Sequence, residues 1–360
     1  MSIISLKNEL SIRILNDYSE ILKHLHIGIN LPILSKFHKY ILDAFKIFKP
    51  NAILVKKKKM SEEPFDSFTD KVMGNCIIFE QDDILFFGFF GVNYNNPFII
   101  EFLVEKLLKY AKNNNYKCIR GPVNIPSVIY GYGFSVEKND NSMMVSANDL
   151  FIACPISPLI YHQIFLKKGF YEKYSEDFYY MPVLKLNPLK LKYDYSNYEV
   201  LFPGRDKIWN YKDDVVRLHM ENMPKESLIT PKSFQYANII INFIFDFGKP
   251  WMVWLVKYKP TNQIVGSAHI VPNVFGKKDN KGRYKTASIQ HVVIDKNHQR
   301  RGLGQFLYGM GSLKATDRKK GNNLKYCLGI VASNNKPSIA LIKKLGGQLY
   351  RRNIILECKL

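Results

Sequence analysis

The six residues QRRGLG, numbered 299–304, place two glycines and two arginines between a stretch rich in β-branched residues and a helical pattern. Glycine lets a backbone approach a ligand closely, and the free amides and dipole of a helix N-terminus attract anions. Arg300 and Arg301 add positive charge at the same point. This arrangement is typical of a turn that holds a pyrophosphate group.

Two other interpretations of 299–304 compete with this one. The first is an ordinary turn between a strand and a helix, because short glycine patterns are common. The second is a dinucleotide-binding turn, which requires a third glycine and a position early in a βαβ unit. Leu307 stands at the third glycine position, and the turn lies near the end of the 360-residue chain. The pyrophosphate interpretation fits its context best.

The elements around the turn alternate between strands and helices, as in an α/β protein. We predict strands at 198–203, 286–295 and 324–332, a hairpin at 251–274 that turns at 260–262, and helices within 206–246, at 301–321 and at 336–347. The first half follows a similar order, with strands at 10–15 and 178–186 and helices at 31–48, 97–115 and 157–170. The segments 164–183 and 340–359 also resemble each other, since both carry a Lys-Lys pair, a glycine and a strand.

These similarities indicate two copies of one fold. We predict an α/β protein with an α+β mixed sheet, in which 1–186 forms a first domain, 187–197 a linker and 198–360 a second domain.

The pattern at 299–304 resembles the Q/R-x-x-G-x-G/A signature of the GCN5-related N-acetyltransferase (GNAT) superfamily. The preceding VID at 293–295 is similar to that family's lead-in, although Lys296 stands where proline is usual. Downstream, NKPSIALIKKLG at 335–346 resembles the family's N-x-x-A-x-x-L-Y-x-K-x-G-F segment. The resemblance covers roughly 198–360, and the first half looks like a degenerate second copy.

The resemblance implies that the second half binds acetyl-CoA as a cosubstrate and transfers the acetyl group to an amine. The strand before the turn would pair with the pantetheine arm, the turn would hold the pyrophosphate, and the residue after the next strand would contact the pantetheine or its phosphate. These cofactor-binding residues would be Val292, Val293, Ile294, Gln299, Arg300, Arg301, Gly302, Leu303, Gly304 and Asn335.

The catalytic groups are less completely defined. His291 stands where the family often has a glutamate, and a neutral imidazole suits a general base near pH 7. A structural role for this histidine is the alternative. The amide of Val293 would stabilise the oxyanion. Ile342 occupies the position of the family's usual general acid, a tyrosine, so the proton donor is unassigned, with Tyr326 and Tyr350 nearby in sequence.

The first half has no QxxGxG turn, so we expect only the second half to bind the cofactor. The stretch RGPVNIPSVIYGYGF at 120–134 is either a structural loop or a substrate-facing loop. The basic stretch FGKKDNKGRYK at 275–285 either contacts an acidic substrate or the 3′-phosphate of CoA, or is a solvated turn. We favour the solvated turn.

The composition limits the possible binding partners, metal sites and cellular compartment. The formal net charge of +21 would suit an anionic partner, but the joint richness in Lys, Asn, Ile, Phe and Tyr favours coding bias, and no nucleic-acid motif accompanies it. The five cysteines include no CxxC pair, so neither a disulfide framework nor a metal site is expected. The sequence shows no signal peptide and no apolar run long enough for a bilayer, which favours a cytoplasmic protein without a membrane partner.

Three functions therefore remain open. The first is an acetyltransferase with an unidentified amine acceptor. The second is a transferase of the same fold that moves a longer acyl or an aminoacyl group. The third is a CoA-binding scaffold without turnover, which the isoleucine at position 342 would suit.

Overall fold

The computed structural model describes residues 9–57, 72–138, 150–183, 194–204, 206–222, 234–247, 253–315 and 324–360. The chain divides into two compact units. Unit 1 comprises Met1–Glu137, Ala153–Ser175 and Arg352–Leu360, and unit 2 comprises Lys138–Ile152 and Glu176–Arg351. Most of the predicted linker, residues 187–193, lies outside the described residues.

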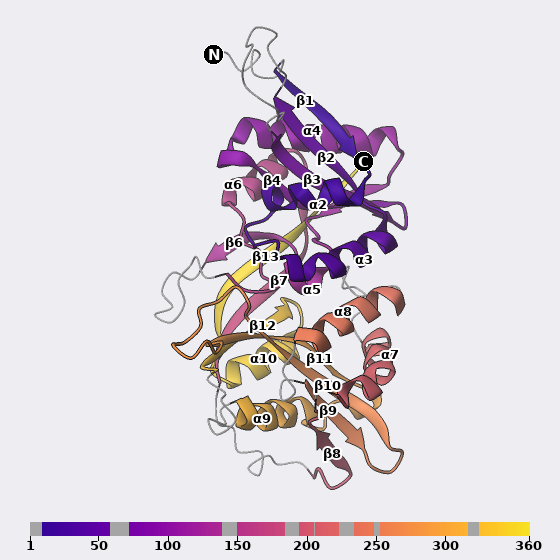
Figure 1. The fold of residues 1–360 in the computed structure, drawn as a ribbon, viewed down its shortest axis with the longest axis vertical. Coiled ribbons are helices and arrows are strands. Elements are labelled where there is room, and N and C mark those ends of the chain that lie inside the picture. Colours follow the sequence, from indigo (N-terminus) through magenta and orange to yellow (C-terminus); the bar gives the residue numbers. More distant parts are fainter. Residues whose placement is uncertain are drawn as a thin grey trace. The chain divides into compact units, whose positions relative to one another are not determined.

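The elements that build unit 1 come mainly from the first half of the chain (Figure 1). Its strands are β1 (Leu10–Leu15), β2 (Asn51–Lys57), β3 (Val72–Gln81), β4 (Ile84–Val92), β5 (Cys118–Gly121), β6 (Phe134–Lys138) and the first part of β7 (Tyr171–Pro182). Its helices are α2 (Tyr18–His24), α3 (His38–Phe48), α4 (Pro97–Asn113), α5 (Ser127–Tyr130) and α6 (Leu159–Lys167), with 3-10 turns η1 (Leu25–Gly28), η2 (Ser35–Phe37) and η3 (Asn93–Asn95).

Unit 2 contains the predicted pyrophosphate turn. Its strands are β8 (Tyr198–Leu201), β9 (Val253–Tyr258), β10 (Gln263–Pro272), β11 (Thr286–Ile294), β12 (Tyr326–Ala332) and the first part of β13 (Gln348–Lys359). Its helices are α7 (Lys212–Asn222), α8 (Phe234–Phe247), α9 (Leu303–Ala315) and α10 (Lys336–Lys344), with 3-10 turns η5 (Ile208–Tyr211) and η7 (Lys296–His298). The hairpin β9–β10 turns at the predicted residues 260–262.

Each unit has a mixed sheet with one parallel pair near its middle. The strand order in unit 1 is β1-β2-β3-β4-β5-β13-β7, and β4 and β5 are parallel. The order in unit 2 is β13-β7-β12-β11-β10-β9-β8, and β11 and β12 are parallel. The mixed α/β fold predicted from the alternating elements is confirmed.

The two units exchange their last strands. Residues 176–182 of β7 pair with β12 in unit 2, whereas Leu356–Lys359 at the end of β13 pair with β5 in unit 1. The predicted domains 1–186 and 198–360 follow the order of the chain, so the compact units differ from them in these strands and in Lys138–Ile152.

Each unit has its own apolar core. In unit 1, Phe87, Phe90, Phe134 and Phe165 pack together, with the rings of Phe87 and Phe165 stacked 5.0 Å apart. In unit 2, Leu303 and Leu307 of α9 pack with β-strand residues and with Ile342 of α10. Burying one such large side chain contributes about 1.5–3 kcal/mol. This packing holds the start of α9 in place directly after the turn 299–304.

None of the helices in the described ranges combines the length and the apolar character that a membrane crossing requires.

Candidate active site

The predicted pyrophosphate turn lies between β11 and α9 and has an unusual backbone. Arg300 (φ 60°) and Gly302 (φ 72°) both adopt left-handed conformations. The side-chain amide of Gln299 donates to the carbonyl of Ile294 (3.0 Å), so this glutamine holds the turn against the end of β11. The side chains of Arg300 and Arg301 are exposed.

The backbone amides at the start of α9 are available for a ligand. The first backbone bond of this helix runs from the amide of Phe306 to the carbonyl of Gly302 (3.0 Å). The amides of Leu303, Gly304 and Gln305 therefore have no acceptor within the helix itself. Gly304 also faces α10, because a Cβ at this position would lie 3.8 Å from the side chain of Leu341. Free amides, a helix dipole and two arginines suit an anion.

A gap opens between β11 and β12 directly beside this turn. The two strands pair from Thr286 to Ile289 and from Tyr326 to Gly329 only. Beyond that point β11 continues along β10, while β12 continues along β7 as far as Ala332. Among the described strands, none pairs with β11 at Val292 and Ile294 on this side, which leaves a strand edge of the kind that an extended arm of a ligand would need.

A β-bulge marks the place where the gap begins. His291 and Val292 together stand opposite the single residue Ala268 of β10, because Ser267 pairs with Val293 and His269 pairs with Gln290. His291 has a left-handed backbone (φ 53°). Such bulges redirect a side chain and interrupt the ladder. The predicted residues Val292, Val293 and Ile294 therefore lie on the free part of β11, and His291 begins it.

The environment of His291 makes its imidazole neutral. Its ring centroid lies 5.2 Å from that of His219 on α7. Burial lowers the pKa of His291 to about 3, and the neighbouring His219 contributes to this shift. A neutral imidazole can accept a proton or a hydrogen bond, but so low a pKa makes it a weak base at pH 7. The role of His291 as general base stays a prediction.

Two residues of the second predicted motif, 335–346, have structural roles: one caps a helix and the other lies in the apolar core. The Asn335 side chain accepts a hydrogen bond from the amide of Ser338 (3.2 Å) and caps α10, which explains the asparagine without a ligand. Its contact with pantetheine stays a prediction. Ile342 is buried among apolar residues of unit 2, so the usual tyrosine position offers no proton donor. Tyr326 stands at the start of β12, away from the gap, and stacks on Tyr180.

Tyr179 is a candidate proton donor that the sequence analysis did not identify. It lies on β7 opposite Gly329, where the pairing of β11 and β12 ends. Its hydroxyl is 3.5 Å from Asp177, which accepts a 2.8 Å bond from Ser333, the first residue after β12. The tyrosine escaped notice because β7 belongs to the first half of the sequence, and only the strand exchange brings it to unit 2.

Unit 1 contains the same bulge but fills the corresponding gap with its own chain. Phe89 (φ 43°) and Phe90 stand opposite the single residue Cys76. The amide of Phe89 donates to the side-chain oxygen of Asn124 (2.6 Å), and the amide of Val123 donates to the carbonyl of Phe87 (2.7 Å). The loop after β5 therefore occupies the edge that is free in unit 2.

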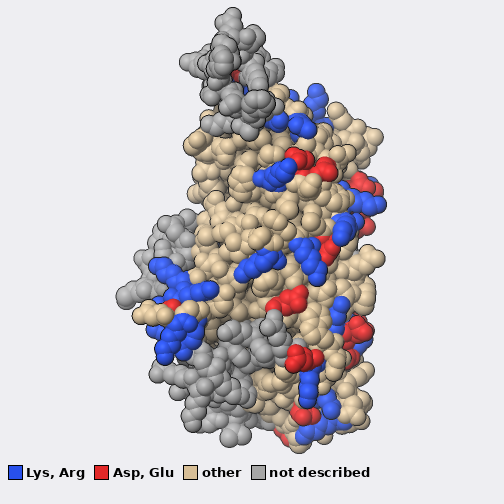
Figure 2. All heavy atoms as spheres, viewed as in Figure 1, with Lys and Arg blue, Asp and Glu red and all other residues tan. Residues whose placement is uncertain are grey.

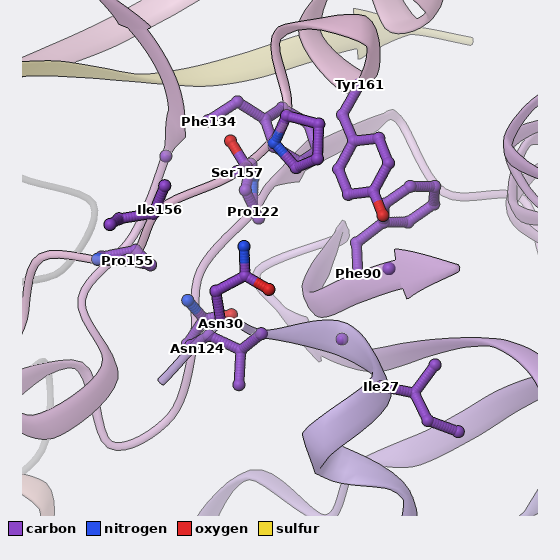
Figure 3. Close-up of a pocket in the computed structure, with 15 residues that line it drawn as sticks. Ile27, Asn30, Phe90, Pro122, Asn124, Phe134, Pro155, Ile156, Ser157 and Tyr161 are labelled. Carbon is purple, nitrogen blue, oxygen red and sulfur yellow. The ribbon is translucent and has the colours of Figure 1, made fainter. Parts of the chain in front are cut away.

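A small pocket is what remains of the gap in unit 1 (Figure 3). Phe90, Pro122, Asn124 and Tyr161 are among the residues that line it, and its volume is about 30 Å³. Typical small-molecule sites measure about 300–1,000 Å³, so this pocket is far too small for a CoA arm. The described parts of the connection between β5 and α6 contribute Pro122, Asn124, Phe134 and Ser157 to the lining. In unit 2, by contrast, three residues, 333–335, connect β12 to α10.

The start of α4 in unit 1 likewise has fewer free amides than that of α9. Pro97 provides no amide at the first helical position, and the side chain of Asn96 accepts from the amide of Phe98 (3.0 Å). Both differences favour a single cofactor site in unit 2.

The basic loop 275–285 lies at the opposite end of β11 from the turn. A group of Lys and Arg side chains marks it on the face shown in Figure 2, where Lys277, Lys278 and Lys281 are exposed. Asp279 pairs with Arg283 (2.8 Å). The nine residues of β11 separate the loop from the turn. At the usual rise of a strand, they span about 25–30 Å. That distance disfavours contact between this loop and the 3′-phosphate of CoA. The remaining interpretations are a solvated turn and a loop that contacts an acidic substrate.

Comparison with known proteins identifies a family for part of the chain. Residues 213–347 match the model of the acetyltransferase (GNAT) family. A search of curated proteins finds no match.

Several solved structures share the fold of nearly the whole chain. A tandem GNAT protein from the clavulanic acid biosynthesis pathway, solved without AcCoA, has a TM-score of 0.56 at 12% identity, with 98% of each chain covered. A GCN5-related N-acetyltransferase from Sphaerobacter thermophilus has a TM-score of 0.53 at 9% identity, covering 97% of this chain and 95% of that one.

A GCN5-related glucosamine N-acetyltransferase region of a fungal multi-domain GH3 β-N-acetylglucosaminidase has a TM-score of 0.55 at 11% identity, covering 97% of this chain and 38% of that one. The family resemblance carried by 299–304 and 335–346 is confirmed. Residues 213–347 thus form a domain of the GNAT acetyltransferase family, within a chain that has the tandem GNAT fold.

Proposed function

We propose that unit 2 transfers an acetyl group from acetyl-CoA to an amine, and that unit 1 binds no cofactor. The observation that carries this proposal is the open edge of β11 beside the turn 299–304. In one place the described residues offer a strand edge without a pairing partner for an extended arm, and free amides for a pyrophosphate.

The turn would hold the pyrophosphate through backbone amides from Arg300 to Gly304, with the two arginine side chains adding charge. A left-handed Gly302 favours this shape, because glycine adopts positive φ without steric cost. Val292, Val293 and Ile294 would pair with the pantetheine arm along the free edge of β11.

The bulge would position the reacting carbonyl. In unit 1 the amide of Phe89 donates to a carbonyl oxygen of the Asn124 side chain. His291 occupies the corresponding position, and by analogy its amide would donate to a thioester oxygen in the gap. This makes it an oxyanion donor beside Val293, whose amide the family resemblance favours.

The amine would attack the thioester carbon, forming the C–N bond while the C–S bond breaks. The proton lost by the nitrogen ends on the sulfur of CoA. Holding the two reactants in place and excluding water supplies much of the acceleration in such a reaction. A dedicated acid at position 342 is therefore not essential, and Tyr179 is the hydroxyl on β7 opposite the end of the β11–β12 pairing.

Two alternatives are supported by specific features. The buried Ile342 at the usual tyrosine position favours a CoA-binding protein without turnover. The tandem fold also suits a transferase that moves a longer acyl or an aminoacyl group.

A thiol-release assay separates these functions. The protein is incubated with acetyl-CoA and a panel of small amines, amino sugars and peptides, and free CoA is measured with and without each acceptor. We expect acceptor-dependent release. Release with longer acyl-CoA only would favour the second alternative, and binding of acetyl-CoA without release for any acceptor would favour the scaffold.

A further inference from the structure

Unit 2 places three histidines side by side, each from a different element. They are His219 on α7, His269 on β10 and His291 at the bulge of β11, and we call them the histidine cluster. The ring centroid of His219 lies 5.7 Å from that of His269 and 5.2 Å from that of His291. His269 is fully buried and His219 is 2% exposed, while His291 is partly exposed. The row therefore runs from the core to the start of the gap.

Several polar atoms of this cluster are buried without a hydrogen-bond partner among the described residues. They are Nε2 of His219, both ring nitrogens of His269, Nδ1 of His291 and the hydroxyl of Ser267. Nδ1 of His219 lies 2.7 Å from the carbonyl of Val215. A carbonyl oxygen only accepts, so this nitrogen carries the proton in the neutral ring, and the backbone of His291 also contacts the His219 ring.

Unit 1 serves as an internal comparison for the cluster. In the register of its bulge, Ile77 corresponds to His269 and Phe89 corresponds to His291. The fold therefore accommodates apolar side chains at both places. A buried polar group without a hydrogen-bond partner is destabilising, so imidazoles that the fold does not require point to a ligand in the unit with the open gap.

The cluster is uncharged and has no charged neighbour on the strands beneath it. Burial lowers the pKa of His219 to about 4 and that of His269 well below its ordinary value, where the other two histidines contribute. The strands β10 and β11 contain no Asp, Glu, Lys or Arg.

The helices above the cluster do carry charges, but these are on their solvent side. Asp213 on α7 and Asp246 on α8 are exposed. Arg217 pairs with Asp214 (3.7 Å) and Glu221 (3.1 Å), and all three side chains are at least one-third exposed. In the described ranges, no group of His, Cys, Asp or Glu is arranged to hold a metal ion.

We infer that the histidine cluster receives the amino group of the acceptor, and that the acceptor is a weakly basic amine that is already neutral near physiological pH. This inference rests on the proposed acyl transfer. The lone pair of His291 accepts an N–H group of the amine, and a cluster without a carboxylate disfavours an ammonium ion, because an unpaired charge is costly to bury.

The chemistry of the step fits neutral imidazoles. The amine nitrogen becomes positive as it bonds to the thioester carbon, and an adjacent imidazole takes its proton at that moment. The C–S bond then breaks, and the proton passes to the thiolate, which leaves as free CoA. No net charge enters or leaves the site.

The acceptor class follows from amine basicity. A peptide α-amino group has a pKa of about 7.7–8.0, against about 10.4 for the ε-amino group of lysine, so its neutral fraction at pH 7 is several hundred-fold larger. An aromatic amine is neutral throughout this range. The structure thus favours α-amino or aromatic amines over lysine side chains and polyamines.

The test measures kcat/KM from pH 6 to pH 10 for four acceptors. They are a peptide with a free α-amine and no lysine, the same peptide with a blocked α-amine and one lysine, an aromatic amine and spermidine. We expect an excess of at least about 100-fold at pH 7 for one of the weakly basic amines over lysine and spermidine. For acceptors that titrate, the acid limb should follow the pKa of the amine.

Preference for the lysine peptide or spermidine at pH 7, or an acid limb at one fixed pH for every amine, would overturn the inference. Activity with the aromatic amine alone identifies an aromatic amine as the acceptor class. Activity with the α-amine peptide identifies a peptide α-amine as the acceptor class.

Calorimetry with acetyl-CoA distinguishes failure of the proposed function from failure of the acceptor inference. If acetyl-CoA does not bind, the proposed function itself fails. If it binds and lysine is preferred, only the acceptor inference fails.

A variant pair tests the cluster itself. His269→Ile introduces the residue found at the corresponding place in unit 1, so the fold should be retained, which circular dichroism and thermal unfolding check. We expect unchanged affinity for acetyl-CoA and at least a tenfold loss of kcat/KM for the acceptor. His162→Gln, a buried histidine of unit 1 that lies 3.3 Å from Glu172, is the matched control and should keep full activity. Full activity in His269→Ile would contradict a role for the cluster.

Discussion

Phe89 and His291 occupy the same position of the same β-bulge in the two units, each with a left-handed backbone. In unit 1 the amide of this residue is taken by Asn124 at 2.6 Å. In unit 2 the strand beyond the bulge has a free edge. One copy of the fold therefore contains an internal substitute for a ligand, and the other is open to one.

The contact made by Asn124 should stabilise unit 1 without affecting catalysis. Its side chain accepts from Phe89 and donates to the carbonyl of Tyr130 (3.1 Å). Because Asn124→Ala leaves these buried groups unpaired, we expect a loss of about 1–3 kcal/mol of stability, measured by urea unfolding. Asn93→Ala, which removes a partly buried bond to Val72 (2.7 Å), is the control and should cost less. An equal loss in both variants would argue against this role.

His291→Phe tests the proposed catalytic role of His291 at the bulge, because phenylalanine is the residue of the other copy. We expect kcat to fall by about 100-fold if the imidazole takes the proton of the amine, with the affinity for acetyl-CoA unchanged. The shape of the pH–rate profile between pH 6 and pH 9 should not change, since burial lowers the pKa of His291 to about 3. Unchanged turnover would show that the ring is structural.

The buried histidines should make the protein sensitive to mild acid. His219 has a pKa of about 4 in the folded state because burial disfavours its charged form, against about 6.5 when unfolded. The unfolded chain binds the proton first, so stability is fully present above pH 6.5 and is lost as the pH falls toward 4. The loss from His219 is about 2 kcal/mol by pH 5.

Urea midpoints at pH 7.5, 6.0 and 5.0 measure this effect. The midpoint should fall across this range in the parent protein and fall less in His269→Ile. A midpoint that is independent of pH in the parent protein would show that these histidines are not buried as neutral groups.

The last strand of the chain is held in unit 1 by a buried ion pair. Arg120 on β5 bonds to Glu357 on β13, with its Nε 2.6 Å from the carboxylate, and Tyr171 donates to the same side chain. Burial alone would raise the pKa of Glu357, but these bonds and the arginine charge lower it. Because Arg120→Leu removes the buried cation and leaves the carboxylate with only Lys173 (3.4 Å) as an ion-pair partner, we expect a loss of up to about 3–5 kcal/mol. Arg120→Leu combined with Glu357→Leu should recover most of it.

The sequence predicted the elements that have strong local signals. The hairpin with its turn at 260–262, the helix after 299–304 and the duplicated order of elements follow from turn residues and hydrophobic periodicity. The helix predicted over 31–48 is shorter, since α3 begins at His38 after a separate turn at 35–37. Residues 223–233 of the predicted helical region 206–246 lie outside the described residues.

The features that the sequence did not reveal depend on contacts between distant segments. The exchange of β7 and β13 places Tyr179 and Asp177 in unit 2, although neighbouring residues in the chain belong to unit 1. The histidine cluster combines residues 219, 269 and 291, whose spacing has no local pattern. Asn124 could be identified as a filler of the gap only after the register of β4 showed a bulge at Phe89.

The central claim is that one copy of the fold, and only one, binds acyl-CoA. Titration calorimetry with acetyl-CoA tests it directly, using the parent protein and Gly302→Glu. The substitution places a carboxylate at the turn and forces a side chain onto a left-handed backbone (φ 72°). We predict one site per chain in the parent protein and no binding in the variant. Two sites per chain, no binding by the parent protein, or undiminished binding by Gly302→Glu would contradict the account.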